Sequence, residues 1–354
     1  MGIEARVTTG FADFIFQNHI SLLLSSHSNG QVIAVGCDQS GFVYDSYACP
    51  KPMGFARQGD DLLIAVDRSL KRFSSVTSKE VAGTQVADSN FTSATYLASS
   101  TVYVGEIDCH EIVFASSRLV VAATKLNCLA AVDQVGQLSC LWKPSFVDEL
   151  VYEDRCHLNG VILDPLNEAE FIVSCHGQCN KAKGWLDVDI AQGCLLHSRH
   201  GFLLRENIVM PHSPRMWHER IVFCNSGCGS LDVFDPASLS HRAIATLPGF
   251  TRGLAVLGDY AIVAFSKARE RFFTKNLPVF RADGRDLKCG LAVIDLLDGK
   301  IVHALEFIGG IDELFDLQIM PGSAPVKLVG LSYQVDTQVK DWDDIIRCEI
   351  VSCN

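Results

Sequence analysis

The chain has 354 residues, of which 48% are apolar and 20% are charged, a balance typical of a packed globular protein rather than a disordered one. Its formal net charge of −11 argues against nucleic acid and anionic membranes as partners, because phosphate binding requires clustered lysines and arginines. No apolar run approaches the roughly 18 residues of a membrane span. The first residues show no signal peptide, so we expect a cytoplasmic protein.

Short strands rich in Val, Ile, Leu and Phe recur along the chain and are separated by Gly, Asn and Asp. The clearest of them begin at Ile33, Leu62, Leu119, Phe171, Ile221 and Tyr260. Helical periodicity is almost absent, and this pattern predicts an all-β protein.

The strands form a repeated unit that opens with a short segment of small or special residues. Six openers begin near residues 51, 108, 155, 210, 251 and 314. Their marker residues are 40 to 64 positions apart and are Met53, His110, His157, His212, Arg252 and Asp316. Repeats of this size with four short strands each are typical of propeller blades. We therefore predict a six-bladed β-propeller in which residues 1–354 form a single domain.

Two strands precede the first opener, between Ser21 and Pro50, and little chain follows the last one. We predict that these N-terminal strands close the last blade by pairing with the segment around Val326 to Tyr333, which removes open sheet edges. Two sandwich domains are the alternative, but they leave the repeated opener unexplained.

Histidines begin the expected inner strands of three successive blades, at His110, His157 and His212. Inner strands line the channel of a propeller, and neutral imidazole is a common ligand for transition metals. We therefore predict a divalent metal (Zn, Fe, Mn or Ca) on these residues, with His176 and Asn225 from neighbouring turns as further ligands. The alternative is that each histidine only hydrogen-bonds a backbone carbonyl at the channel mouth.

Cationic side chains on the same face, in a protein that is acidic overall, predict a small polar or anionic substrate. Arg215, Arg252 and Lys267 are the candidates, and ion pairs between blades are the alternative explanation for them. Glu111 and Asp154 are candidates for a general base beside a metal-bound water.

Two other features concern loops and cysteines. The charged segment from Lys267 to Lys288 is expected to be a loop over the pocket face, either a lid or a solvated excursion. The 14 cysteines lack a regular framework spacing and are expected to be reduced thiols.

Three segments stand out as motifs: EDRCHLNG from Glu153, PHSPR from Pro211 and PGFTRGL from Pro248. Together with shorter matches from about Ser21 to Met320, they resemble a bacterial protein family of unknown function. The resemblance implies a site at the matching positions, which are His157, Asn159, His212, Arg215, Asn225, Arg252, Lys267 and Arg269. The architecture is more distantly similar to gluconolactonase and strictosidine-synthase-like propellers. The gluconolactonase type holds its metal on carboxylates and amides, whereas this sequence offers histidines.

From these residues we predict a metal-dependent hydrolase or lyase that acts on a small polar or anionic molecule at the propeller axis. Two alternatives stay open. One is a non-catalytic propeller that binds a metabolite or a protein across the same face, and the other is a redox enzyme with histidine-bound iron or copper.

Overall fold

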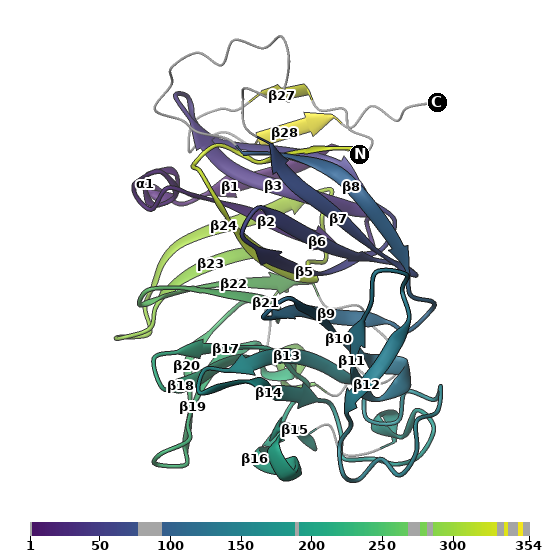
Figure 1. Cartoon of the computed structure of the whole chain (residues 1–354). Helices are drawn as coiled ribbons and strands as arrows, with labels where there is room; N and C mark the ends of the chain where they lie inside the picture. The colour runs from purple at the N-terminus through teal and green to yellow at the C-terminus, as the bar shows by residue number, and fades with distance from the viewer. Residues whose placement is uncertain are drawn as a thin grey trace.

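Six largely antiparallel sheets surround a central axis in the computed structural model, each with one strand next to the axis (Figure 1). The structure describes residues 2–76, 94–187, 191–267, 277–281, 286–330, 336–338 and 346–349. The predicted six-bladed β-propeller is confirmed. We number the blades along the chain by their inner strands, which are β5, β9, β13, β17, β21 and β25.

Blades 1 to 3 follow one another without interruption. Blade 1 contains β5 (Pro52–Gln58), β6 (Asp61–Val66), β7 (Ser69–Val76) and β8 (Thr95–Tyr103). Blade 2 contains β9 (Cys109–Ala115), β10 (Arg118–Ala123), β11 (Cys128–Val132) and β12 (Leu138–Trp142). Blade 3 contains β13 (Leu158–Asp164), β14 (Asn167–Cys175), β15 (Gly193–His197) and β16 (Phe202–Ile208). Short 3₁₀ turns, η1 (Thr124–Leu126), η2 (Gly184–Leu186) and η3 (Arg199–Gly201), connect these strands.

Blades 4 and 5 continue the pattern. Blade 4 contains β17 (Pro211–Trp217), β18 (Arg220–Asn225), η4 (Ser226–Cys228), β19 (Ser230–Asp235) and β20 (Ser240–Thr246). Blade 5 contains β21 (Phe250–Leu257), β22 (Tyr260–Ser266), β23 (Cys289–Asp295) and β24 (Ile301–Gly309). Its outer edge is extended by β1 (Ile3–Val7), β28 (Ile346–Glu349) and β27 (Asp336–Gln338).

Blade 6 joins the two ends of the chain. Its inner strand β25 (Asp316–Pro321) pairs with the N-terminal strand β2 (Ile20–Ser26), and β3 (Gln31–Asp38) and β4 (Gly41–Ala48) complete the sheet. Closure by N-terminal strands is therefore confirmed. The predicted partner segment is wrong, because β26 (Lys327–Val329) instead runs parallel to β8 at the outer edge of blade 1. Residues 331–333 lie outside the described part of the chain.

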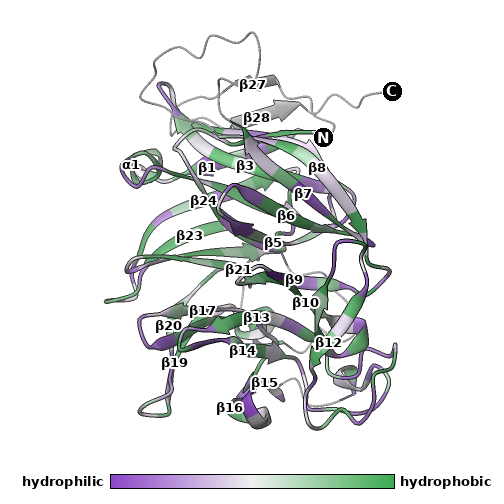
Figure 2. Cartoon of the chain, viewed as in Figure 1, coloured by the Kyte–Doolittle hydropathy of each residue, from purple (hydrophilic) through white to green (hydrophobic). Residues whose placement is uncertain are grey.

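Apolar cores lie between neighbouring blades, because successive side chains of a strand point to opposite faces of its sheet. In β6, Leu62 and Ile64 pack toward blade 6, whereas Leu63 and Ala65 pack toward blade 2. Figure 2 shows hydrophobic residues concentrated along the strands. Truncating one such buried leucine to alanine destabilises a protein by roughly 2–5 kcal/mol.

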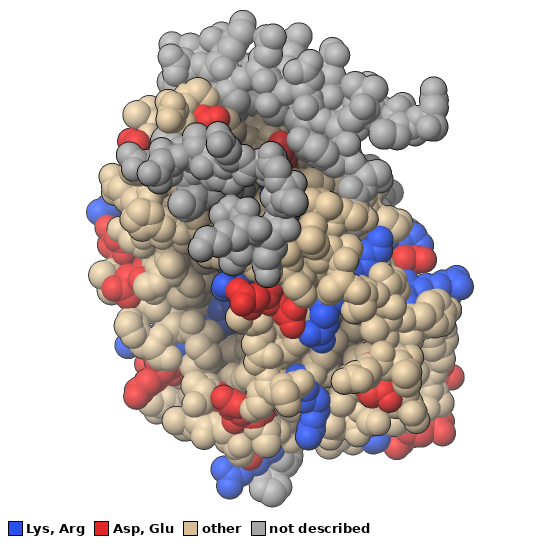
Figure 3. Space-filling view, turned by 45° about the horizontal axis from the view of Figure 1, so that its top comes forward, with Lys and Arg blue, Asp and Glu red and all other residues tan. Residues whose placement is uncertain are grey.

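Helix α1 (Phe11–Gln17) covers the junction between blades 5 and 6 through Phe11, Phe14 and Ile15. Neither α1 nor any other helix among the described residues has the length and apolar content needed to cross a membrane. Acidic and basic side chains are interspersed on the face drawn in Figure 3.

Candidate functional site

A pocket of about 460 Å³ opens where the inner strands begin, and we call it the axial pocket. All six blades contribute to its wall. Its lining includes Met53, Asp108, His110, Asp154, His157, His176, Trp185, Met210, His212, Phe250, Arg252, Lys267, Glu313 and Phe315. A volume of this size suits a small molecule.

The backbone at the pocket ends of the inner strands is irregular in a repeated way. The strand pairing shifts register near the start of β5, β9, β13, β17 and β21. Such bulges kink a strand and redirect its side chains. The residue before the strand also has a positive φ in four blades, at Lys51, Asp108, His157 and Met210. These features aim the first side chains of each strand toward the axis.

The three predicted histidines do not occupy one repeated position. His110 and His212 are each the second residue of their strands, whereas His157 lies one residue before β13. The blade 3 equivalent of His110 is therefore Asn159. The predicted positional equivalence is wrong for His157, because the sequence spacing alone did not fix where β13 begins.

Four imidazoles nevertheless form a continuous arc around the pocket. The ring centroids of His110 and His157 are 4.8 Å apart, and those of His157 and His176 are 4.5 Å apart. His212 continues the arc, with its ring centroid 4.8 Å from that of His176. The structure thus brings together all four histidines that the sequence singled out.

His110 and His212 are each held by a contact between Nδ1 and the backbone carbonyl oxygen two residues earlier in the chain. Nδ1 of His110 lies 3.0 Å from the carbonyl oxygen of Asp108, and Nδ1 of His212 lies 3.0 Å from that of Met210. A carbonyl oxygen only accepts hydrogen bonds, so Nδ1 carries the proton in both rings and Nε2 has a free lone pair. Burial holds the pKa of both imidazoles well below its usual range, so both are neutral at pH 7.

His157 is oriented by a carboxylate. Its Nδ1 lies 2.9 Å from Oδ2 of Asp154, which also accepts a 2.9 Å hydrogen bond from the indole Nε1 of Trp185. The indole packs against the imidazole at 4.2 Å between ring centroids. An imidazole held by a carboxylate in this way presents Nε2 as a proton acceptor.

His176 is the least satisfied polar group of the wall. It follows β14 directly and is 4% exposed. Both of its ring nitrogens are buried without a hydrogen-bond partner among the described residues. Burial holds the pKa of this imidazole well below its usual range. A buried polar group without a partner costs roughly 1–3 kcal/mol, so His176 is a destabilising element of the pocket wall.

Arg252 is one of three cationic residues that line the pocket, with Lys183 and Lys267. Its guanidinium carbon lies 3.3 Å from the ring centroid of Phe315, and within the described part of the chain it makes no ion pair or hydrogen bond. Burial lowers its pKa to about 10, so the group stays charged at neutral pH. An unpaired guanidinium stacked on an aromatic ring is well suited to bind a carboxylate or a phosphate.

Glu111 and Arg215, two predicted catalytic residues, lie outside the pocket lining and pair with each other on the axis. Arg215 Nη1 donates to Glu111 Oε1, and its Nη2 lies 3.8 Å from Oδ1 of Asp316. Glu111 also accepts a 2.9 Å hydrogen bond from the backbone nitrogen of Val161. This cluster joins the inner strands of blades 2, 3, 4 and 6. Its groups are engaged with one another, which favours the interpretation of Arg215 as an ion pair between blades.

Lys267 and Asn225 are also engaged with protein groups. Lys267 lies at the pocket rim, where its Nζ is 2.7 Å from Asp312. Asn225 is not part of the lining, because its amide accepts from the backbone of Val209 and donates to Asp232.

Only part of the predicted loop from Lys267 to Lys288 is described. Helix α2 (Pro278–Arg281) and the preceding Leu277 flank the pocket, where Leu277 and Val279 pack against Val209 and Met210. Residues 268–276 and 282–285 lie outside the described part.

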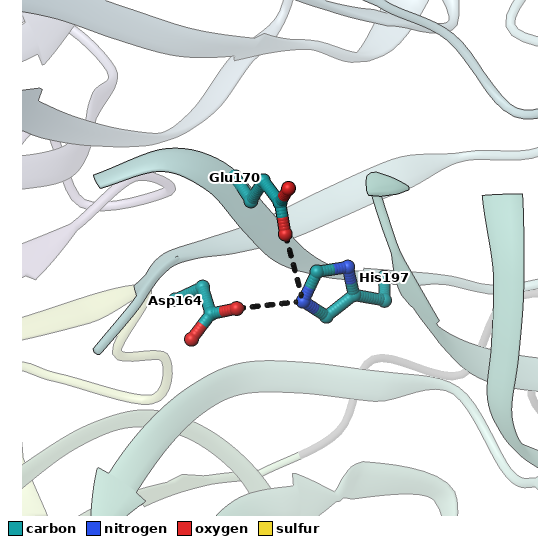
Figure 4. A group of neighbouring side chains, drawn as sticks. All are labelled: Asp164, Glu170 and His197. Atoms are coloured by element: carbon teal, nitrogen blue, oxygen red, sulfur yellow. Dashed lines mark hydrogen bonds and ion pairs between the residues drawn. The ribbon is translucent and has the colours of Figure 1, made fainter. Parts of the chain in front are cut away.

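Within the described residues, one group of three His, Cys, Asp or Glu side chains places its ligand atoms within 4.8 Å of one another. It comprises Asp164, Glu170 and His197 on blade 3 (Figure 4) and includes none of the pocket histidines. His197 Nδ1 accepts a 3.0 Å hydrogen bond from the backbone of Arg199, so Nε2 carries the proton that it donates to Asp164 at 2.9 Å. Both nitrogens are engaged in these hydrogen bonds, so a metal at this group would have to displace the Nε2 proton.

The aromatic residues of the lining outside the arc of four histidines were not predicted as site residues from the sequence. They are His27, which stacks on Phe315 at 5.7 Å between ring centroids, together with Trp185, Phe250 and Phe315 itself. Phe315 directly precedes β25, so its position at the last opener could have identified it as a pocket residue from the sequence. His27 and Trp185 come from connecting segments that the repeat does not mark.

A family model described as a domain of unknown function, DUF4915, matches residues 9–328. The chain belongs to this family. The predicted membership of a family of unknown function is confirmed, and no curated protein matches the sequence.

Solved structures show the fold. A protein of unknown function from Bacteroides caccae is 12% identical with a TM-score of 0.53, and the match covers 85% of this chain and 98% of that one. A chain of a nidogen/laminin complex is 10% identical with a TM-score of 0.50 and has the same coverages.

Proposed function

We propose that the axial pocket is the active site of an enzyme that acts on a small anion. Arg252 holds the anionic group and His157 is the general base. The observation that carries the proposal is the guanidinium of Arg252, which lines the pocket without a carboxylate partner among the described residues. A cation that served the fold alone would be paired, as Arg215 is with Glu111.

The His157–Asp154 pair supports acid–base chemistry. With its Nδ1 proton held by Asp154, His157 takes a proton at Nε2 from the substrate or from a water molecule. The carboxylate then stabilises the imidazolium that forms. Proton removal from the substrate leads to elimination, whereas proton removal from water leads to hydrolysis, and the same pair serves both reactions. A positioned base of this kind contributes roughly 10²–10⁴-fold to a rate.

A divalent transition metal on the pocket imidazoles is the second candidate. It is favoured by the anchored Nδ1 atoms of His110, His157 and His212, since histidines that bind metals usually donate their other ring nitrogen to a carbonyl or a carboxylate. The metal would activate a water molecule or carry redox chemistry. The ring nitrogens are spread along an arc, however, and no three of them meet the 4.8 Å separation found at Asp164, Glu170 and His197. We therefore place acid–base chemistry first.

Turnover of a mixture of small carboxylates and phosphates, followed by mass spectrometry, tests the proposal. We expect the wild-type protein to convert at least one anion with loss or gain of the mass of water, and His157→Asn to be at least 100-fold slower. His218→Asn is the matched control, because His218 is exposed and pairs with Asp259 away from the pocket. Equal turnover by His157→Asn and wild type contradicts the base assignment. Binding without any turnover favours a non-catalytic metabolite-binding propeller.

A further inference from the structure

We infer that the anion recognised by the axial pocket is hydroxylated: a small hydroxy acid whose carboxylate binds Arg252 and whose hydroxyl groups donate hydrogen bonds to Nε2 of His110 and His212. This inference rests on the proposed function and names its substrate class.

The hydrogen-bond chain behind His110 fixes which of its nitrogens accepts. The Thr124 hydroxyl donates to the carbonyl oxygen of Leu158 at 2.6 Å. Its oxygen therefore accepts from Nδ1 of His110, at 2.9 Å, as the carbonyl oxygen of Asp108 also does. Both partners of Nδ1 are acceptors, so Nε2 is an unprotonated acceptor that faces the pocket.

His212 repeats this arrangement two blades further along the chain. Its Nδ1 is 3.0 Å from the carbonyl oxygen of Met210 and 2.8 Å from the hydroxyl of Ser226, which occupies the position of Thr124 after the second strand. No described residue hydrogen-bonds to Nε2 of either histidine. The pocket thus presents two fixed imidazole acceptors, with His157 and His176 between them in the arc.

The other charged groups of the lining determine what must complement these acceptors. Asp108, Asp154 and Glu313 are also acceptors, Lys267 is paired with Asp312 at the rim, and the exposed Lys183 adds a further cation to the lining. A carboxylate has no proton to donate to the imidazoles, so it belongs at Arg252. Hydroxyl groups supply the protons that the imidazoles lack. An ammonium group would also donate, but it would lie beside the unpaired positive charge of Arg252.

Such a site discriminates strongly between a ligand with hydroxyl groups and its deoxy analogue. An analogue without them leaves buried acceptors unpaired, which disfavours its binding by more than the loss of the contacts alone.

Calorimetric titration of the full-length protein with matched pairs of acids tests this inference. The pairs are tartrate and succinate, glycerate and propionate, and gluconate and hexanoate. We expect the hydroxylated member of at least one pair to bind at least tenfold more tightly than its partner. His110→Phe and His212→Phe should each remove most of that preference while retaining the weak, Arg252-dependent binding of the deoxy acid. His218→Phe, on the surface of blade 4, should retain the full preference.

The possible outcomes separate this inference from the proposed function. Equal affinities within every pair, each lost in Arg252→Gln, overturn the hydroxy-acid inference and leave the anion site standing. Binding of aspartate in preference to tartrate also overturns it, in favour of an amino acid. Failure of every acid to bind contradicts both proposals. Because the wild-type comparison needs no variant, a folding defect in a histidine variant does not affect it.

Discussion

The guanidinium carbon of Arg252 in blade 5 lies 3.3 Å from the ring centroid of Phe315, which directly precedes the inner strand of blade 6. The ring supports one face of the guanidinium and leaves its N–H groups available to a ligand. The guanidinium of Arg252 is thus held in position without a bound anion.

Removing this charge should weaken anion binding. We expect Arg252→Gln to lower the affinity for a bound acid by roughly 10- to 100-fold, because a hydrogen bond to a charged group contributes about 1.5–3 kcal/mol. Calorimetric titration measures the effect. Arg220→Gln is the control, since Arg220 is a surface residue that packs on Trp217 and pairs with Asp235. Unchanged affinity in Arg252→Gln would place the anion elsewhere.

The tautomers of the pocket histidines can be observed directly. We expect ¹⁵N NMR of the ligand-free, metal-free protein at pH 7.5 to show His110 and His212 protonated at Nδ1 and unprotonated at Nε2, because both Nδ1 atoms face carbonyl oxygens. Asp154→Asn should leave these two signals in place and alter that of His157. Protonation at Nε2 in His110 and His212 would contradict the inference that these two nitrogens accept hydrogen bonds from the ligand.

Arg215 is expected to matter for stability. Arg215→Ala leaves Glu111 buried without its cation, and breaking a buried ion pair typically costs about 3–5 kcal/mol. Arg68→Ala removes an exposed pair with Glu106 and should change stability far less, because solvent screens exposed ion pairs. Urea unfolding measures both. Equal losses in the free energy of unfolding would show that the buried pair of Arg215 and Glu111 contributes no more to stability than an exposed ion pair.

The same cluster predicts a pH dependence. Burial raises the pKa of the Asp316 carboxyl, Arg215 lowers it and Glu111 on β9 raises it, with a net pKa of about 7. The folded state therefore binds a proton at Asp316 that the unfolded state has released, so this stabilisation is greatest in acid and is lost as the pH rises through about 7. We expect the wild type to lose roughly 1.4 kcal/mol relative to Asp316→Asn between pH 6 and 8.5. A constant difference between the two proteins contradicts the raised pKa.

Much of the architecture follows from local patterns in the sequence. Each blade repeats its turn residues and its apolar strands, so the openers near Lys51 and Asp108 could be located without coordinates. The strand that pairs with the N-terminal strands could not be predicted from the sequence, because β25 and β26 are both short apolar segments. Only the geometry of the ring selects β25 as the inner strand.

The chemistry of the site was less predictable than its location. Arg215 and Arg252 both lie in predicted blade openers, yet one is paired with Glu111 and the other lines the pocket without an acid. That difference arises from contacts between blades more than 90 residues apart in sequence, such as the one between Arg215 and Glu111. His157 was recognised as a site residue, but its shift relative to His110 depends on where β13 begins.

A crystal structure of the protein with bound tartrate tests the central claim most directly. The account predicts one carboxylate within about 3.2 Å of the Arg252 guanidinium and a hydroxyl at the same distance from Nε2 of His110 or His212. Anomalous scattering data from the same crystal show whether a metal is present. Tartrate bound away from Arg252, or a metal ion on the pocket imidazoles with Arg252 not contacting the ligand, would contradict it.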